Sequence, residues 1–217
     1  MFRAQNEMGR SRIPRRVKTS VVVIAVVMMI AFSGCSNYSA NYFPLPRTGQ
    51  WTYDLRVTNS ALRSESGSYI CVVDGKQTIQ GKRYTRIVNI TKGITSAETT
   101  VGLYRRAHDG IYFRDASKPD DKESLLLPDS PVVGKSWTTV SGNVKRESRI
   151  ESFETLEVSG RKYEQSLKIS FTLTGPDGVF TGYEYRAPGV GHIRQLMLGD
   201  EFRGDWTLKD FRKCPVR

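Results

Sequence analysis

Strict alternation of apolar and polar side chains constrains the fold of this 217-residue chain more than any other feature. In residues 50–58, Trp51, Tyr53 and Leu55 alternate with polar or charged residues, and residues 167–173 repeat the pattern. Because successive side chains of an extended strand point to opposite faces, the pattern predicts strands that bury one face and expose the other. Such strands are typical of antiparallel sheets.

Turn signals divide the chain into a series of such segments. The turn signals are Asp74-Gly75, Asp109-Gly110, Ser159-Gly160 and residues 175–178. The expected strands lie near residues 50–58, 68–74, 77–80, 83–91, 98–106, 110–114, 136–141, 148–158, 162–174, 179–187, 192–198 and 204–210. Residues 115–131 are expected to form a long irregular loop. We therefore predict an all-β fold, an antiparallel meander that forms a curved sheet or open barrel.

Two pairs of segments suggest that this domain consists of two similar halves. PRTGQWTY at 46–53 resembles PVVGKSWTT at 131–139, and GKRYTRIVNI at 81–90 resembles GRKYEQSLKI at 160–169. The alternative is a chance match, because only two copies are present.

A basic segment and a short apolar run precede the alternating region. Residues 1–18 carry six basic residues and one acid, and residues 21–32 are apolar without interruption. A helix of that length spans roughly 18 Å, which is too short to cross a ~30 Å hydrocarbon core. The combination is typical of a secretory signal.

The apolar run ends in Phe32-Ser33-Gly34-Cys35, which resembles the lipobox of bacterial lipoproteins, although Leu is commoner than Phe at the first position. The resemblance implies cleavage before Cys35 and attachment of acyl chains to its sulfur. An ordinary cleaved signal and an uncleaved anchor are the alternatives. We expect residues 1–34 to be a lipoprotein signal peptide, 35–42 a tether and 43–217 a single β-rich periplasmic domain.

The acyl chains on Cys35 would make the membrane a permanent partner, because each buried CH₂ contributes about 0.8 kcal/mol. Ser36, in place of an aspartate, favours the outer membrane facing the periplasm if the host is Gram-negative. Removal of residues 1–34 lowers the formal net charge from +11 to +6. Since acids are interspersed with the bases and no recognition motif occurs, we expect no nucleic-acid partner.

Two cysteines remain once Cys35 is acylated. Export would place Cys71 and Cys214 in an oxidising compartment, where disulfides persist. We predict a disulfide between them, and two unpaired thiols are the alternative.

Three further segments resemble the signatures of a broad group of bacterial lipoproteins. They are YFPLPRTGQWTYDL at 42–55, LLLPDSPVVGKSW at 125–137 and YRAPGVGHIRQL at 185–196. The group opens with PL-x-x-G-x-x-W-x-Y, and this chain has one residue fewer between Gly49 and Trp51. The resemblance implies a β-rich periplasmic domain and, because the group carries no agreed activity, no functional residue beyond Cys35.

Catalytic and metal motifs are scarce. His108, before a turn, and His192, after APGVG, are the two histidines, and neither G-x-S-x-G nor H-E-x-x-H occurs. We interpret both as surface or turn histidines and predict a protein that is not an enzyme. An envelope hydrolase is the alternative, and it requires a histidine within hydrogen-bond reach of a nucleophile or carboxylate.

The loop at 115–131 is the candidate for metal binding. Its acidic residues are Asp115, Asp120, Asp121 and Glu123. Pro119 interrupts the spacing and no glycine follows at the bend, unlike a calcium loop. We therefore predict a solvated loop, no metal and no cofactor.

Aromatic residues gather on the expected strands. They are Trp51, Tyr53, Tyr69, Tyr84, Phe113, Trp137, Phe171, Tyr183, Tyr185 and Trp206. We interpret them mainly as core and predict a non-catalytic structural or binding module. The alternative is a lipid or lipoprotein carrier, whose half-barrel would enclose an empty apolar concavity of several hundred Å³.

Overall fold

The computed structural model of the chain describes residues 38–59, 64–94, 98–118 and 121–213. These belong to the second of two compact units, residues 37–217. The strands are β1 (Gln50–Asn59), β2 (Ser64–Ile79), β3 (Lys82–Lys92), β4 (Thr99–Arg106), β5 (Gly110–Asp115), β6 (Ser124–Pro128), β7 (Ser136–Ser141), β8 (Val144–Val158), β9 (Arg161–Gly175), β10 (Gly178–Ala187), β11 (Gly191–Gly199) and β12 (Phe202–Arg212). In the described part of the chain, the helix α2 (Tyr38–Tyr42) precedes them, and no helix there is long and apolar enough to cross a bilayer.

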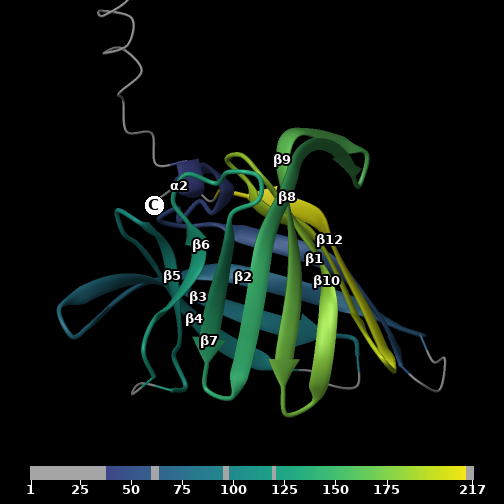
Figure 1. The fold of residues 1–217 in the computed structure, drawn as a ribbon, viewed down its shortest axis with the longest axis horizontal. Helices are drawn as coiled ribbons and strands as arrows, with labels where there is room; N and C mark the ends of the chain where they lie inside the picture. Colours follow the sequence, from purple (N-terminus) through teal and green to yellow (C-terminus); the bar gives the residue numbers. More distant parts are fainter. Residues whose placement is uncertain (1–37, 60–63, 95–97, 119–120, 214–217) are drawn as a thin grey trace, which may run out of the picture. The chain divides into compact units, whose positions relative to one another are not determined.

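The strands form a single antiparallel sheet in the order β6-β5-β4-β3-β2-β1-β12-β11-β10-β9-β8-β7. Each strand is therefore paired with its neighbours in sequence, except that β6 and β7 are not paired with each other, and β1 is paired with β12. The sheet curves until it is nearly closed into a barrel, with one unsealed seam between β6 and β7 (Figure 1). The predicted all-β antiparallel meander is confirmed.

Side chains rather than a backbone ladder cross the seam. Trp137 Nε1 donates a hydrogen bond to the carbonyl oxygen of Leu126 at 3.2 Å. Thr139 Oγ1 donates to the carbonyl oxygen of Leu125 at 2.5 Å. These bonds attach β7 to β6 without the regular pairing that joins the other strands.

Two local expectations were wrong. The loop predicted over residues 115–131 contains β6, whose backbone pairs with β5 from Gly110 opposite Pro128 to Phe113 opposite Ser124. The turn predicted at Asp74-Gly75 is a bulge inside β2, because the strand continues past it to Ile79. Gly75 has a φ of 78°, which bends the strand for one residue without reversing the chain.

The similar segments occupy matching places in the two sets of six strands. Residues 46–53 and 131–139 lead into β1 and β7, and residues 81–90 and 160–169 form most of β3 and β9. This placement agrees with two similar halves, and the duplication itself stays a prediction.

The segment assigned to the tether ends on the barrel. Residues 38–42 form α2, and Tyr42 donates a hydrogen bond from its hydroxyl to the carbonyl oxygen of Gln165 at 2.9 Å. The Gly189 amide donates to the carbonyl oxygen of Asn41 at 2.7 Å. These bonds hold α2 against one end of the barrel (Figure 1).

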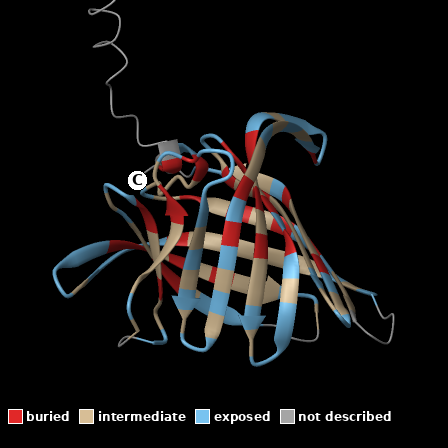
Figure 2. Cartoon of the chain, in the orientation of Figure 1, coloured by how far each residue is buried: buried red, intermediate tan, exposed pale blue. Residues whose placement is uncertain are grey.

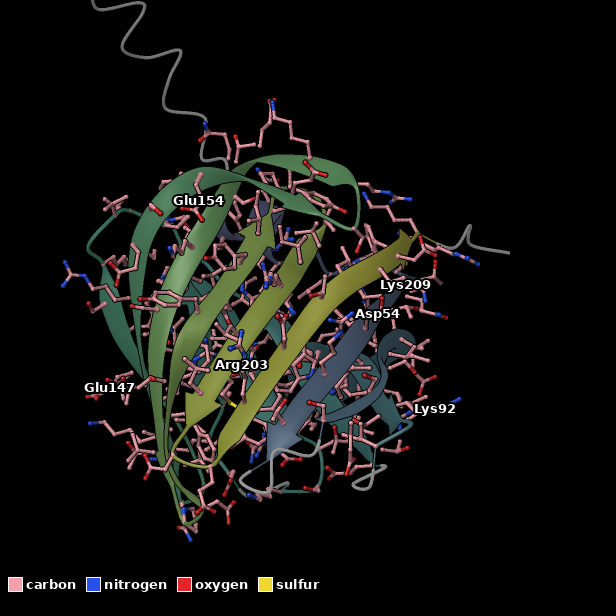
Figure 3. The ribbon with its side chains drawn as sticks, turned by 90° about the vertical axis from the view of Figure 1, so that its right-hand side faces the viewer. Asp54, Lys92, Glu147, Glu154, Arg203 and Lys209 are labelled. Carbon is pink, nitrogen blue, oxygen red and sulfur yellow. The ribbon has the colours of Figure 1, made fainter. Side chains whose placement is uncertain are left out.

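Burial follows the alternation of the strands. Exposed positions concentrate at hairpin ends and on the outer surface (Figure 2). On that surface Asp54 of β1 and Lys209 of β12 form an ion pair of 3.4 Å (Figure 3). Inside, one apolar cluster fills the barrel between β5, β6, β8 and β9; it comprises Tyr42, Ile111, Leu127, Ile150, Leu167 and Ile169. A second apolar cluster comprises Trp51, Tyr53, Val73, Ile87, Val158, Ala187, Ile193 and Leu208. Its residues Trp51, Tyr53 and Ile87 border a part of the interior that is left open.

Candidate functional site

A cavity of about 470 Å³ occupies the unfilled part of the barrel. Its volume lies in the roughly 300–1,000 Å³ range of small-molecule sites. Most of its wall is aromatic or aliphatic, including Trp51, Leu55, Ile87, Tyr104, Met197 and Trp206. Of the aromatic residues predicted as core, Trp51, Tyr53, Tyr69 and Trp206 line this concavity.

The alternation of β1 supplies one side of this wall. Trp51, Tyr53 and Leu55 are 6%, 3% and 2% exposed and face inward as predicted. Trp51 Nε1 donates to the carbonyl oxygen of Val190 at 2.7 Å, and the Tyr53 hydroxyl donates to that of His192 at 3.0 Å. These two bonds fix the rings against the start of β11.

Charged side chains form another part of the wall. Glu184 and Arg186 share a face of β10 because they are two residues apart, and Arg146 reaches them from β8. Glu184 Oε1 accepts from Arg186 Nε at 2.8 Å, and Oε2 accepts from Arg146 Nη2 at 2.7 Å. The guanidinium of Arg146 also lies over the Phe171 ring, 4.4 Å from its centre.

Two pKa values in this group are strongly displaced. Burial alone would raise the pKa of Glu184, but the charges of Arg146 and Arg186 overcome it and hold that pKa well below its usual range. Burial, reinforced by the positive charge of Arg186, lowers the pKa of His192 to about 4. At neutral pH the carboxylate is therefore ionised and the imidazole is uncharged.

Two nitrogen atoms here lack hydrogen-bond partners within the described residues. They are Arg186 Nη1 and His192 Nε2, and both are buried. Buried donors and acceptors are nearly always satisfied in native proteins. Both residues line the cavity, so a ligand with a polar group could supply the missing partners.

The wall beside Trp51 contains neutral titratable groups. Burial raises the pKa of the Cys71 thiol to about 12, and it also raises the pKa of the Tyr69 and Tyr104 hydroxyls well above the usual value. These groups stay protonated at neutral pH. They give the apolar wall hydrogen-bonding capacity without charge.

The two histidines have different environments. His108 has a side chain that is 95% exposed, in agreement with a surface position. His192 lies in β11 and lines the cavity, so its assignment as a surface or turn residue was wrong. In its strand the apolar Ile193 stands between the polar His192 and Arg194, a pattern that predicts an outward histidine, so the sequence carries no signal for its inward position.

The acidic loop is tied down by ion pairs. Glu123 Oε1 accepts from Lys82 Nζ at 2.6 Å, and Oε2 accepts from Tyr84 at 2.7 Å. Arg105 donates to both oxygens at 3.0 and 2.7 Å. Burial opposes ionisation, but these hydrogen bonds hold the pKa of Glu123 at about 2. Asp115 accepts from the Ser117 amide and hydroxyl.

The remaining predictions concern metal ligands, one aromatic residue and two cysteines. Among the residues that the structure describes, no group of three potential metal ligands comes together, and Asp120 lies outside them. Tyr183 is 41% exposed, so its assignment to the core was wrong: it points outward because Glu184 points inward. Cys35 and Cys214 also lie outside the described residues, and the acylation and the disulfide stay predictions.

Comparisons with known proteins leave the family open. No family model and no curated protein matches the chain. Similar solved structures include a protein described as exported, with a YmcC-like fold, from Bacteroides fragilis, at 13% identity over 79% of this chain and 99% of that chain, with a TM-score of 0.49. Others are a protein described as a lipoprotein from Parabacteroides distasonis (12% identity, 79% and 98% coverage, TM-score 0.40) and LprF from Mycobacterium bovis (14% identity, 77% and 87% coverage, TM-score 0.28). At these values the likeness supports no argument about function, and the resemblance of the motifs to bacterial lipoproteins stays a prediction.

Proposed function

We propose that the chain is a non-catalytic envelope lipoprotein whose barrel binds an apolar or amphipathic ligand. The cavity of about 470 Å³ is the observation that carries the binding part. A barrel that served only as a scaffold would gain stability by filling this space, since an empty apolar cavity forfeits packing contacts. A ligand chain would recover those contacts.

The anchoring part of the proposal rests on the lipobox. Acylation of Cys35 would hold the barrel at a membrane surface, and Ser36 favours the outer membrane facing the periplasm. An anchored barrel would have its ligand close by if that ligand is a membrane lipid or a product of one. Mass spectrometry of the mature protein tests this part: we expect an acylated cysteine at position 35, and an unmodified or different first residue would overturn it.

Quenching of tryptophan fluorescence tests the binding part. Trp51 and Trp206 line the cavity, and a bromine atom quenches an indole only near contact. The purified full chain, held in lipid nanodiscs, is titrated with dodecanoate that carries a terminal bromine. We expect saturable quenching, and its absence would overturn the proposal.

A pair of matched variants locates the binding. Val57→Phe combined with Met197→Phe adds volume to the cavity wall. Val179→Phe combined with Leu198→Phe adds the same volume at positions that are 55% and 39% exposed. The first pair should raise the half-saturating concentration about tenfold, because it takes space from the ligand. The second pair should leave it unchanged, and equal effects would contradict binding inside the barrel.

A further inference from the structure

We propose that the cavity selects an amphiphile with a single apolar chain and an anionic headgroup, either a carboxylate or a phosphate, and that Arg186 binds the headgroup. This inference rests on the proposed function and names the class of ligand. The argument comes from the bonding, the charge and the position of Arg186.

The bonding of Arg186 is incomplete. Its side chain is only 5% exposed, and its Nε donates to Glu184. Its Nη1 is buried without a partner among the described residues, although Arg186 lines the cavity. A guanidinium presents its donors as a planar fork that matches two oxygen atoms of a carboxylate or phosphate. An anionic group in the cavity would therefore complete its hydrogen bonds.

The charge balance of this wall also favours an anion. Arg146 and Arg186 share the single carboxylate of Glu184, which leaves one positive charge uncompensated. His192 adds no charge at neutral pH because its imidazole stays unprotonated. Glu98 is the other carboxylate among the described lining residues, and it is exposed, where water screens its charge. A buried charge is costly unless it is paired, so an anionic ligand would be favoured over a neutral one.

The position of Arg186 sets the orientation of the ligand. Arg186 lies one residue before the end of β10, and its guanidinium lies 4.9 Å from the ring centre of Phe43, which follows α2. Val57 and Phe202 line the cavity near the opposite end of the strands. The headgroup would therefore lie at the end of the barrel that α2 covers, with the apolar chain directed away from it.

Three probes that differ only in their headgroup test the inference. Dodecanoate, dodecyl phosphate and dodecanol, each with a terminal bromine, are titrated into the full chain in lipid nanodiscs, and tryptophan quenching is measured. We expect the acid, the phosphate or both to reach half-saturation at a concentration about tenfold below that of the alcohol. The tighter of the two anions identifies the headgroup.

Variants assign the preference to Arg186. Arg186→Gln should reduce the preference for the anion about tenfold, and Arg186→Lys should keep most of it because the charge remains. Arg194→Gln is the control, since Arg194 pairs with Asp205 at 3.0 Å and does not line the cavity. It should behave as the wild type.

Each outcome decides one question. Equal binding of the alcohol and both anions to the wild type would overturn the inference and leave the proposed function in place. An unchanged preference in Arg186→Gln would overturn the role of Arg186. If none of the probes quenches, the proposed function and the inference both fail. Should Arg186→Gln not fold, the wild-type comparison still decides the class of ligand, and a complete loss of the anion preference in Arg186→Lys would contradict a role that depends on the charge.

Discussion

Glu184 and Arg186 form an ion pair inside the barrel, with 2.8 Å between Oε1 and Nε, although their side chains are only 3% and 5% exposed. Removing one member of such a pair leaves an uncompensated charge away from water. The pair is therefore expected to be important for stability whether or not a ligand binds beside it.

Glu184→Gln should lower the free energy of unfolding by about 3–5 kcal/mol, because two guanidinium groups would face each other without a carboxylate between them. Glu147→Gln is the control, since its side chain is 57% exposed and its pairing with Lys145 lies at the surface (Figure 3). The control should change stability by less than about 0.5 kcal/mol. Urea unfolding of both variants measures the difference, and similar values would contradict a structural role for the buried pair.

Most of the strands could be predicted from the sequence because each is an alternating segment bounded by a turn. β6 could not, since Leu125, Leu126 and Leu127 form an unbroken apolar run between charged loops. Such a run does not distinguish a strand from a loop that packs on the core. Its burial depends on residues that are remote in sequence, since Leu127 packs with Ile150, Leu167 and Ile169.

The charged part of the site was harder to predict, because the alternation in β10 suggests that its aromatic residues face inward. Tyr183 and Tyr185 are its large aromatic residues, and a period of two places them on one face. That face is the outer one, and Glu184 and Arg186 face inward. Glu184 is paired there with Arg186 on the same strand and with Arg146, which lies 38 residues away along the chain and is not revealed by a local pattern. Alternation also does not show whether the inward faces of a barrel meet or enclose a space.

His192 should make the protein sensitive to mild acid. Its pKa is about 4 in the folded state against 6.5 in an unfolded chain. Between these values the unfolded chain binds a proton that the folded protein does not, so stability is complete above pH 6.5 and falls as the pH decreases toward 4. The loss between pH 6.5 and 4.5 should be on the order of 2 kcal/mol.

The histidine variants isolate this effect. His192→Gln should flatten the pH dependence of the unfolding free energy above pH 4.5, where most carboxylates are still ionised. His108→Gln should leave the dependence unchanged because that side chain is 95% exposed. Urea unfolding at a series of pH values provides the measurement. A flat wild-type profile over this range would show that the imidazole is not held neutral.

The seam should be the weakest part of the barrel. Thr139→Val removes the hydroxyl that donates to Leu125 across it, and should lower the free energy of unfolding by about 1 kcal/mol. It should also speed hydrogen exchange of amides in β6 selectively, because β6 is an edge strand. Thr138→Val, on the exposed face of the same strand, is the matched control. Equal exchange in both variants would mean that the hydroxyl does not hold the seam.

The predicted disulfide can be tested by alkylation. In the folded protein Cys71 should not react with iodoacetamide near neutral pH, because burial raises the pKa of its thiol to about 12. Unfolding in guanidinium chloride without reductant removes that protection. If Cys71 and Cys214 are bonded to each other, neither is alkylated until a reductant is added, and mass spectrometry of the peptides then finds both modified. Alkylation of both in guanidinium chloride alone would establish two free thiols and leave Cys71 as a neutral donor in the wall of the cavity.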